Sequence, residues 1–292
     1  MQPLLHPIRA PDSRFVNWGR TFACAPLAVF EPENVHHCQL VLELARREGK
    51  VVRPVGVGHS PSDLSCTSGY MLRTTKLNRL LEVRRSSRHA PSTLHTHRTQ
   101  VDVDKRYVVA EAGITLDALH AELAKHGLAM INVGSISDQT LGGIITTATH
   151  GTGINYGVIS THVIALSLLL ADGTRVSCSR QERPDLFIAS ICGLGSTGLI
   201  LSVTLQVEPA FRLRETQQSL TFHECIRKMD ALVPASQHVR VWWYPAADTM
   251  RVFSADRTVE VSSPFRHPHP HPQHRPFLSI CPLESRSASQ GT

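Results

Sequence analysis

The sequence predicts an α+β protein, and two kinds of pattern predict it. The stretches 33–50 and 115–126 carry apolar residues at helical spacing. Short runs rich in Val, Ile and Leu have strand character, and two of them, 163–170 and 175–178, flank the Asp-Gly hairpin signal at 172–173. Helices and antiparallel hairpins in one chain indicate a mixed architecture.

Both helical stretches have recognisable ends. Gly49 stops the first. Thr115 is placed to cap the second, which ends at Gly127. We expect Leu116, Leu119 and Leu123 to face the core.

The remaining strands are predicted from short apolar runs between turn residues. They are expected at 51–55, at 107–111, at 199–207, as an antiparallel pair at 239–243 and 250–253, and as one strand with its turn within 72–83.

Composition indicates a globular protein with a mild preference for anionic ligands. The chain is 41% hydrophobic and 18% charged, which is ordinary for a globular domain. Its formal charge of +6 is scattered, which suits a dinucleotide and does not indicate a nucleic-acid partner. The seven cysteines form no CxxC pair, so we expect neither a zinc ribbon nor a disulfide framework, and a reducing intracellular compartment. Residues 1–20 lack a signal-peptide core, and no run approaches the roughly 20 apolar residues of a membrane span.

A glycine loop, Gly56-Val57-Gly58-His59-Ser60, follows the strand at 51–55. Glycines tolerate positive φ and let backbone N–H groups converge on an anion such as a pyrophosphate. It is not a Rossmann turn, because that fingerprint needs a third glycine opening a helix. An ordinary tight turn with His59 exposed is the alternative that this loop alone leaves open.

The segment 193–198 matches G-x-G-x-x-G letter for letter. The residues before it, 185–192, have helical character and those after it form a strand, which is the reverse of the dinucleotide fingerprint. We interpret it as a helix-to-strand turn.

A second glycine cluster spans 141–153, with Asn132-Val133-Gly134-Ser135 upstream. Small residues and hydroxyls let a backbone lie against an extended ligand. A glycine-rich surface loop is the alternative. The apolar residues Leu141, Ile144 and Ile145 favour a segment that lines a ligand.

Together these segments resemble the sugar-1,4-lactone oxidases, which belong to the vanillyl-alcohol-oxidase superfamily and have a PCMH-type FAD-binding domain. The likeness lies in 53–63, 109–114, 132–153, 171–173, 194–200 and 238–245. It implies a PCMH-type domain of two α/β subdomains over 15–209, interrupted by an irregular insertion at 84–100. It also implies the start of a substrate domain over 210–261.

The resemblance implies FAD as cofactor and a set of binding residues. His59 would carry FAD covalently through the 8α-methyl group, which requires an unprotonated imidazole at that moment. Ile200 would meet the adenine through its backbone. His150 would either contact the cofactor or orient its loop. The full set expected at the cofactor is Gly56, Val57, Gly58, His59, Ser60, Ser135, Gly142, Thr146, His150, Gly151 and Ile200. No catalytic base and no metal ligand is assigned.

The chain departs from the family pattern in two places. The insertion 84–100 is polar, basic and longer than the family's link. From 262 onward the resemblance stops, and 262–292 is rich in Pro, His and Ser, which predicts a disordered tail. Family members continue there with the rest of the substrate domain.

The expected function is FAD-dependent oxidation of an aldono-1,4-lactone, D-arabinono-1,4-lactone foremost, with O2 as acceptor and H2O2 as product. The resemblance places this reaction in ascorbate- or erythroascorbate-type biosynthesis, at a mitochondrial membrane with peripheral attachment. One alternative is a truncated flavin-binding remnant without turnover. Another is a metal-binding module formed by His267, His269, His271 and His274 in the tail.

Overall fold

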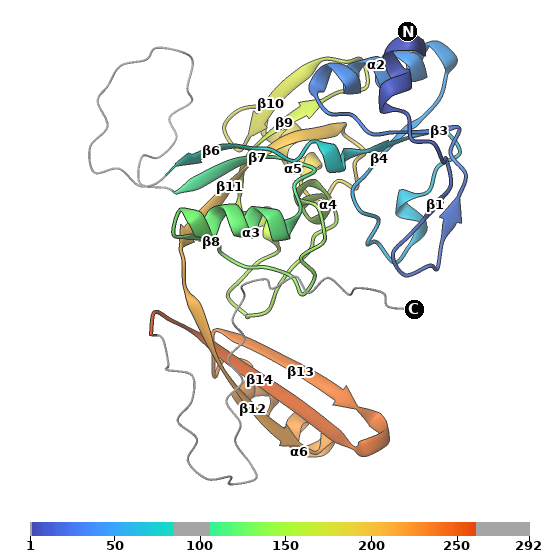
Figure 1. Ribbon diagram of the computed structural model, residues 1–292. Helices are drawn as coiled ribbons and strands as arrows, with labels where there is room; N and C mark the ends of the chain where they lie inside the picture. Colours follow the sequence, from blue (N-terminus) through green and yellow to red (C-terminus); the bar gives the residue numbers. More distant parts are fainter. Residues whose placement is uncertain (1, 85–105, 261–292) are drawn as a thin grey trace, which may run out of the picture. The chain divides into compact units, whose positions relative to one another are not determined.

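The computed structural model describes residues 2–84 and 106–260 of the chain. The chain divides into two compact units. The first consists of Met1–His150 and Val158–Glu208, and the second of Gly151–Gly157 together with the residues from Pro209 onward. Figure 1 shows the elements of each unit in sequence colours.

A small parallel sheet opens the first unit. Its order is β3-β5-β4, with β3 at Ala28–Phe30, β5 at Tyr70–Arg73 and β4 at Val52–Val55. The helix α2, Val35–Glu48, connects β3 to β4. Parallel neighbours need such a crossover connection.

The ends of α2 follow from its local sequence. The Asn34 side chain accepts a hydrogen bond from the His37 backbone N–H at 2.9 Å and caps the first turn. Gly49 at the other end has φ of 62°, a left-handed conformation that glycine adopts without a Cβ clash. The predicted helix at 33–50 and its glycine stop are confirmed.

A larger, six-stranded sheet forms the rest of the first unit's framework. Its order is β10-β9-β11-β7-β6, and β8 pairs with β11. The strands are β6 Leu80–Arg84, β7 Tyr107–Glu111, β8 Leu128–Met130, β9 Val163–Leu169, β10 Arg175–Ser179 and β11 Leu199–Pro209. The predicted hairpin across the Asp-Gly turn is confirmed, because β9 and β10 pair antiparallel.

Three helices accompany this sheet: α3 at Leu116–Lys125, α4 at Leu141–Thr146 and α5 at Pro184–Ser190. α3 lies beside β8 (Figure 1). The Thr115 hydroxyl accepts from the Ala118 N–H and caps α3, as predicted.

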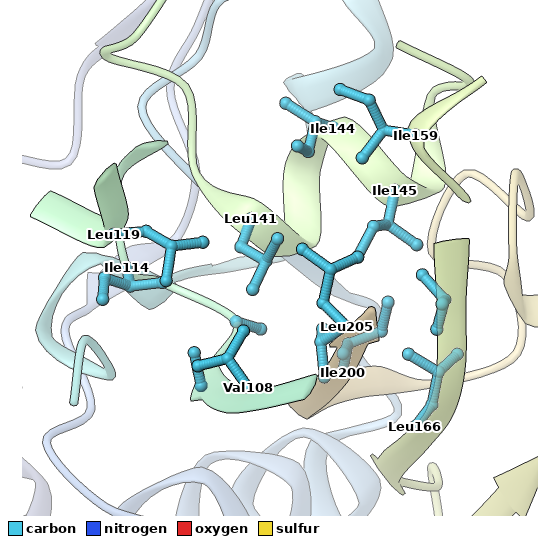
Figure 2. Packing of buried hydrophobic residues seen from close by; sticks show 14 of the residues in the cluster. Val108, Ile114, Leu119, Leu141, Ile144, Ile145, Ile159, Leu166, Ile200 and Leu205 are labelled. Atoms are coloured by element: carbon cyan, nitrogen blue, oxygen red, sulfur yellow. The ribbon is translucent and has the colours of Figure 1, made fainter. Parts of the chain in front are cut away.

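The main hydrophobic core lies between these helices and the strands. Leu116, Leu119 and Leu123 of α3 are buried in it, as the helical spacing predicts. Figure 2 shows how the leucines and isoleucines of α4 gather with those of the large sheet. Burial of about 25 cal/mol per Å² of apolar surface is the main favourable term in such a core.

The described chain also contains several short elements. They are α1 Gln2–Leu5, η1 His6–Ile8, β1 Phe15–Val16, β2 Ala23–Cys24, η2 Asp63–Ser65, η3 Thr74–Lys76, η4 Ile159–His162 and η5 Pro245–Ala247.

The second unit is built on a three-stranded antiparallel sheet of order β12-β14-β13. The strands are β12 Arg212–Leu220, β13 His238–Tyr244 and β14 Thr249–Thr258. Two short helices follow β12, α6 at Phe222–Arg227 and α7 at Met229–Leu232. The predicted pair at 239–243 and 250–253 is confirmed, since β13 and β14 pair along their lengths.

Some expectations need correction, and others fall outside the described residues. The region 72–83 was expected to hold one strand with its turn, but it contains the end of β5, the turn η3 and most of β6, which belong to different sheets. Arg84, the first residue of the predicted insertion, is the last residue of β6. The rest of that insertion and the tail 262–292, with its four histidines, lie outside the described residues.

His238 in the second unit is a buried histidine with a defined environment. Its Nδ1 lies 3.0 Å from the Thr152 carbonyl oxygen, and its ring stacks on Tyr156 with centroids 4.7 Å apart. Burial lowers the pKa of His238 and outweighs the opposing effect of its contact with the Thr152 carbonyl, while the nearby Arg257 acts in the same direction as burial. The neutral imidazole is therefore the form that the folded unit prefers.

We expect the second unit to lose stability as pH falls below about 6.5, the ordinary pKa of histidine. The unfolded chain takes up a proton on His238 near its ordinary pKa of about 6.5, while the folded unit resists protonation down to its lower pKa. The loss therefore begins below about 6.5 and is complete at the folded pKa. Thermal unfolding followed by tryptophan fluorescence measures it, because Trp242 and Trp243 lie in this unit. His238→Gln should flatten the dependence, and equal slopes in both proteins would contradict this account.

Candidate functional site

The loop 56–60 is held at the carboxyl end of β4 by close approach to two neighbours. A Cβ at Gly58 would lie 2.9 Å from Cζ of Phe15, and φ there is 77°, so only glycine fits without strain. A Cβ at Gly56 would clash with the Thr140 side chain. The two glycines thus let the loop lie against Phe15 on one side and Thr140 on the other.

The first part of the second glycine cluster forms the helix α4, Leu141–Thr146, which has an apolar face and a face of small and polar residues. Leu141, Ile144 and Ile145 are buried in the main core. Gly142 lies so close to β7's end that a Cβ would be 2.9 Å from the Ala112 Cβ. The Thr146 hydroxyl donates to the carbonyl groups one turn earlier, at 3.1 Å, which leaves its lone pairs available to accept.

The turn at 193–198 is joined to α4 by backbone hydrogen bonds. The Cys192 N–H donates to the Ile145 carbonyl at 3.0 Å, and the Leu194 N–H donates to that of Thr146 at 3.1 Å. It connects α5 to β11, so the interpretation as a helix-to-strand turn is confirmed. Gly198, at φ of 142°, approaches the Leu169 carbonyl too closely for any side chain.

These three segments line one cleft in the first unit. About 830 Å³ of space lies between its walls, part of it open to solvent. The walls comprise residues 53–60, 64–65, 139–140, 142–144, 146–147, 194–195 and 198–200, with Thr74 and Ala112. Residues of both glycine-rich segments that the sequence analysis singles out thus line the same cleft.

The described residues that line the cleft include a positively charged side chain and no negatively charged one. Arg53 is the one Arg or Lys residue lining it, and no Asp or Glu lines it. The Arg53 Nε is buried without a hydrogen-bond partner in the described chain, while its Nη1 lies 3.5 Å from the Leu194 carbonyl oxygen. A buried guanidinium N–H without a protein partner favours an anionic ligand.

His59 also lines the cleft and has an unused ring nitrogen. Its Nδ1 is buried and makes no hydrogen bond to the residues that the structure describes. The imidazole ring stacks on Trp18, with centroids 5.3 Å apart and planes at 27°. The ring is thus supported on one face and retains a free nitrogen, which is what a nucleophilic or ligand-contacting histidine needs.

Eight of the predicted cofactor residues line this cleft and three do not. Those lining it are Gly56, Val57, Gly58, His59, Ser60, Gly142, Thr146 and Ile200. Ser135 and His150 are exposed and lie outside its walls. Gly151 belongs to the second unit. The cofactor roles of all eleven remain predictions.

Several wall residues were missing from the prediction. Arg53 stands directly before the glycine loop, so a cation at the end of that strand was an available signal. Thr140 precedes the second cluster by one residue. Leu194 and Gly195 lie in the segment 193–198. Its order of helix, turn and strand is the reverse of a dinucleotide fingerprint, but these two residues line the cleft.

Within 2–84 and 106–260 no group of three or more His, Cys, Asp or Glu side chains is arranged to hold a metal ion. In the same residues no helix combines the length and apolar character that a membrane crossing requires.

Two family models match the chain. One, described as FAD binding domain, matches residues 26–179. The other, described as D-arabinono-1,4-lactone oxidase, matches residues 203–278. The second match continues past residue 262, where the sequence resemblance was expected to stop.

Similar proteins with curated names are sugar-lactone oxidases. L-gulonolactone oxidase of Mus musculus is 41% identical over 245 residues, which cover 84% of this chain and 52% of that protein. D-arabinono-1,4-lactone oxidase of Yarrowia lipolytica is 36% identical over 241 residues, covering 82% of this chain and 43% of that protein. The chain therefore spans about half the length of these relatives. These matches confirm the resemblance noted in the sequence.

Solved structures with a similar fold are cholesterol oxidases. A structure titled "Solvent-stable cholesterol oxidase" has a TM-score of 0.71 at 23% identity, covering 87% of this chain and 49% of that one. Cholesterol oxidase from B. sterolicum has a TM-score of 0.71 at 20% identity, covering 88% and 49%. At such identity the likeness concerns the fold alone, and it agrees with the expected α+β fold.

Proposed function

Because this chain belongs to the FAD binding domain family, we propose that it holds FAD in the cleft of the first unit and serves FAD-dependent oxidation of an aldono-1,4-lactone. The carrying observation is the cleft itself, which both glycine-rich segments line; among its described lining residues Arg53 is a cation and none is a carboxylate. D-arabinono-1,4-lactone is the first substrate to test, in line with the match over 203–278. L-gulono-1,4-lactone is the second, since a protein named for it is 41% identical.

The residues of the cleft fit a dinucleotide cofactor. The space that a Cβ would fill at Gly56 and Gly58 is occupied by neighbouring protein, so the backbone of this loop forms the wall and no side chain screens it at these two positions. Arg53 has a buried N–H without a partner in the described chain. A diphosphate bears two negative charges and would supply acceptors there.

Each part of the wall has an expected task. The loop 56–60 and Arg53 would hold the diphosphate. Thr146 and Gly142 of α4 would border the cofactor, and the backbone at Ile200 would meet the adenine. When bound, FAD supplies the redox chemistry: it accepts a hydride from C2 of the lactone, and O2 takes up the electrons to give H2O2.

We also assign His59 as the site of covalent attachment. The bond would join a ring nitrogen of His59 to the 8α-methyl carbon of FAD. Attachment would replace the imidazole N–H and one methyl C–H by the new N–C bond, and O2 would take up the two electrons and two hydrogens as H2O2. A ring nitrogen without a hydrogen-bond partner in the described chain supports this assignment.

A test of attachment uses the full 292-residue chain. The purified protein is denatured and run on a gel, and flavin fluorescence at its band is measured. We expect a fluorescent band that His59→Ala abolishes. His36→Ala is the matched control, because His36 is exposed on α2. Covalent flavin that survives His59→Ala would disprove attachment at His59.

Turnover is tested separately by lactone-dependent H2O2 release from the same preparation. Release with D-arabinono-1,4-lactone or L-gulono-1,4-lactone supports the oxidase function. Bound FAD without peroxide release from either lactone would instead support a flavin-binding protein without turnover. The mitochondrial membrane location implied by the resemblance stays a prediction.

A further inference from the structure

The loop that carries His59 is braced by a hairpin far away in the sequence. We call residues 15–24 the bracing hairpin; it contains β1 and β2, which pair antiparallel. Its turn is organised by Asn17, which is only 2% exposed. The side-chain oxygen accepts hydrogen bonds from the Thr21 and Phe22 N–H groups at 2.9 and 3.0 Å. A buried amide so placed fixes the shape of the turn.

Three hydrogen bonds connect the bracing hairpin to the loop, on both sides of His59. The Trp18 N–H donates to the Gly58 carbonyl at 2.9 Å. The Asn17 Nδ2 donates to the Ser60 carbonyl at 3.0 Å. The third runs from the Thr21 hydroxyl to the Pro61 carbonyl at 3.1 Å. The backbone on either side of His59 is therefore fixed to one element.

The same hairpin places an aromatic ring on the His59 imidazole. Trp18 is 69% exposed, yet its indole stacks on His59 with centroids 5.3 Å apart. Packing in the hydrophobic core does not explain the position of so exposed an indole. Its one ring contact in the described chain is His59. The backbone hydrogen bond from Trp18 to Gly58 brings the side chain of Trp18 next to that of His59, which follows Gly58 in the chain.

We propose that Trp18, held by the bracing hairpin, is a positioning residue that orients the His59 ring for attachment to FAD. This inference rests on the proposed covalent function of His59. Stacking restricts rotation of the imidazole about its side-chain torsions while leaving Nδ1 without a protein partner. Attachment needs a ring nitrogen aimed at one carbon, and such orientation contributes strongly to rate. Trp18 itself undergoes no chemistry.

The test measures attachment kinetics in the full chain prepared free of flavin and then mixed with FAD. We expect Trp18→Ala to slow the appearance of covalent fluorescence by about tenfold, because ring orientation is lost. Non-covalent FAD binding, followed by fluorescence quenching, should change by less than about twofold, since Trp18 is not in the cleft wall. Trp18→Phe keeps a stacking ring and should restore most of the rate.

Phe22→Ala is the matched control. Phe22 is an aromatic residue of the same hairpin, is 41% exposed and has no ring contact with His59 among the described interactions. It should attach FAD at the wild-type rate. Attachment by Trp18→Ala at the wild-type rate would overturn the proposal, and so would equal losses in Trp18→Ala and Phe22→Ala.

A second readout does not depend on FAD. In the flavin-free protein, the imidazole proton signals of His59, assigned with His59→Ala, should shift when Trp18→Ala removes the indole ring current. Unchanged signals would overturn the stacking itself. Including His59→Ala in the kinetic series distinguishes the proposal of covalent attachment at His59 from the proposal that Trp18 positions the His59 ring. If it retains covalent flavin, attachment at His59 is wrong; if it loses flavin while Trp18→Ala behaves as wild type, only the positioning role is wrong.

Discussion

Gly113→Ala is expected to destabilise the first unit by about 3 kcal/mol or more, the upper range for overpacking a core. A Cβ at this position would overlap the Thr74 carbonyl oxygen and lie 2.6 Å from its carbon and 2.7 Å from the Leu77 carbonyl oxygen. These are backbone atoms, so no side chain can rotate away. The Gly113 N–H donates to the same Leu77 carbonyl at 2.8 Å, which holds the two segments together.

Gly113→Ala should disturb the cleft as well as lower the stability of the fold. Ala112 and Thr74 both line the cleft, and both would have to move. Chemical denaturation measures the stability, and retention of FAD measures the cleft. Gly19→Ala is the matched control: the nearest atom to its Cβ would be the Thr21 hydroxyl at 3.7 Å, so we expect a change within about 0.5 kcal/mol. Equal stability of the two variants would contradict the steric argument.

Phe187→Ala is expected to cost about 3–5 kcal/mol, as for other buried phenylalanines reduced to alanine. Phe187 lies on α5, has no exposed surface and belongs to the main hydrophobic core. Its removal leaves a cavity next to side chains of the large sheet. Because α5 leads into the turn at 193–198, loss of its packing should also weaken FAD binding.

Phe187→Leu tests whether the stability lost in Phe187→Ala comes from the lost volume or from the lost aromatic ring. Leucine fills most of the space, so we expect a cost of about 1–1.5 kcal/mol. The Arg180 guanidinium lies over the Phe187 ring, 5.7 Å from its centroid. Because Arg180 is exposed, this cation–π contact contributes little to stability. Denaturation midpoints at unchanged slope are the measurement. A Phe187→Ala cost below about 1 kcal/mol would contradict the assignment of Phe187 to the core.

Elements with local signals were predicted well. The Thr115 cap, the Gly49 stop and the Asp-Gly turn each act through hydrogen bonds or backbone angles a few residues apart. Such features can be recognised in a sequence because both partners lie in the same short window.

Elements without local signals were missed. α4 contains Gly142 and Gly143, which disfavour a helix, and its stability comes from burial of Leu141, Ile144 and Ile145. β12 was not predicted either, because its residues are mainly polar. It forms a strand through nine residue pairs with β14, in a register that no local pattern specifies.

The sequence by itself determined the α+β class, the ends of α2 and α3, and the two glycine-rich segments, residues of which line the cleft. Only the tertiary structure decided that Arg53, Thr140 and Leu194 share one cleft, and that Trp18 lies on His59. The physical reason is the range of the interactions. Caps and turns join neighbours in the chain, whereas the cleft depends on the pairing of strands within the sheets and on glycines whose missing side chains let distant backbones approach.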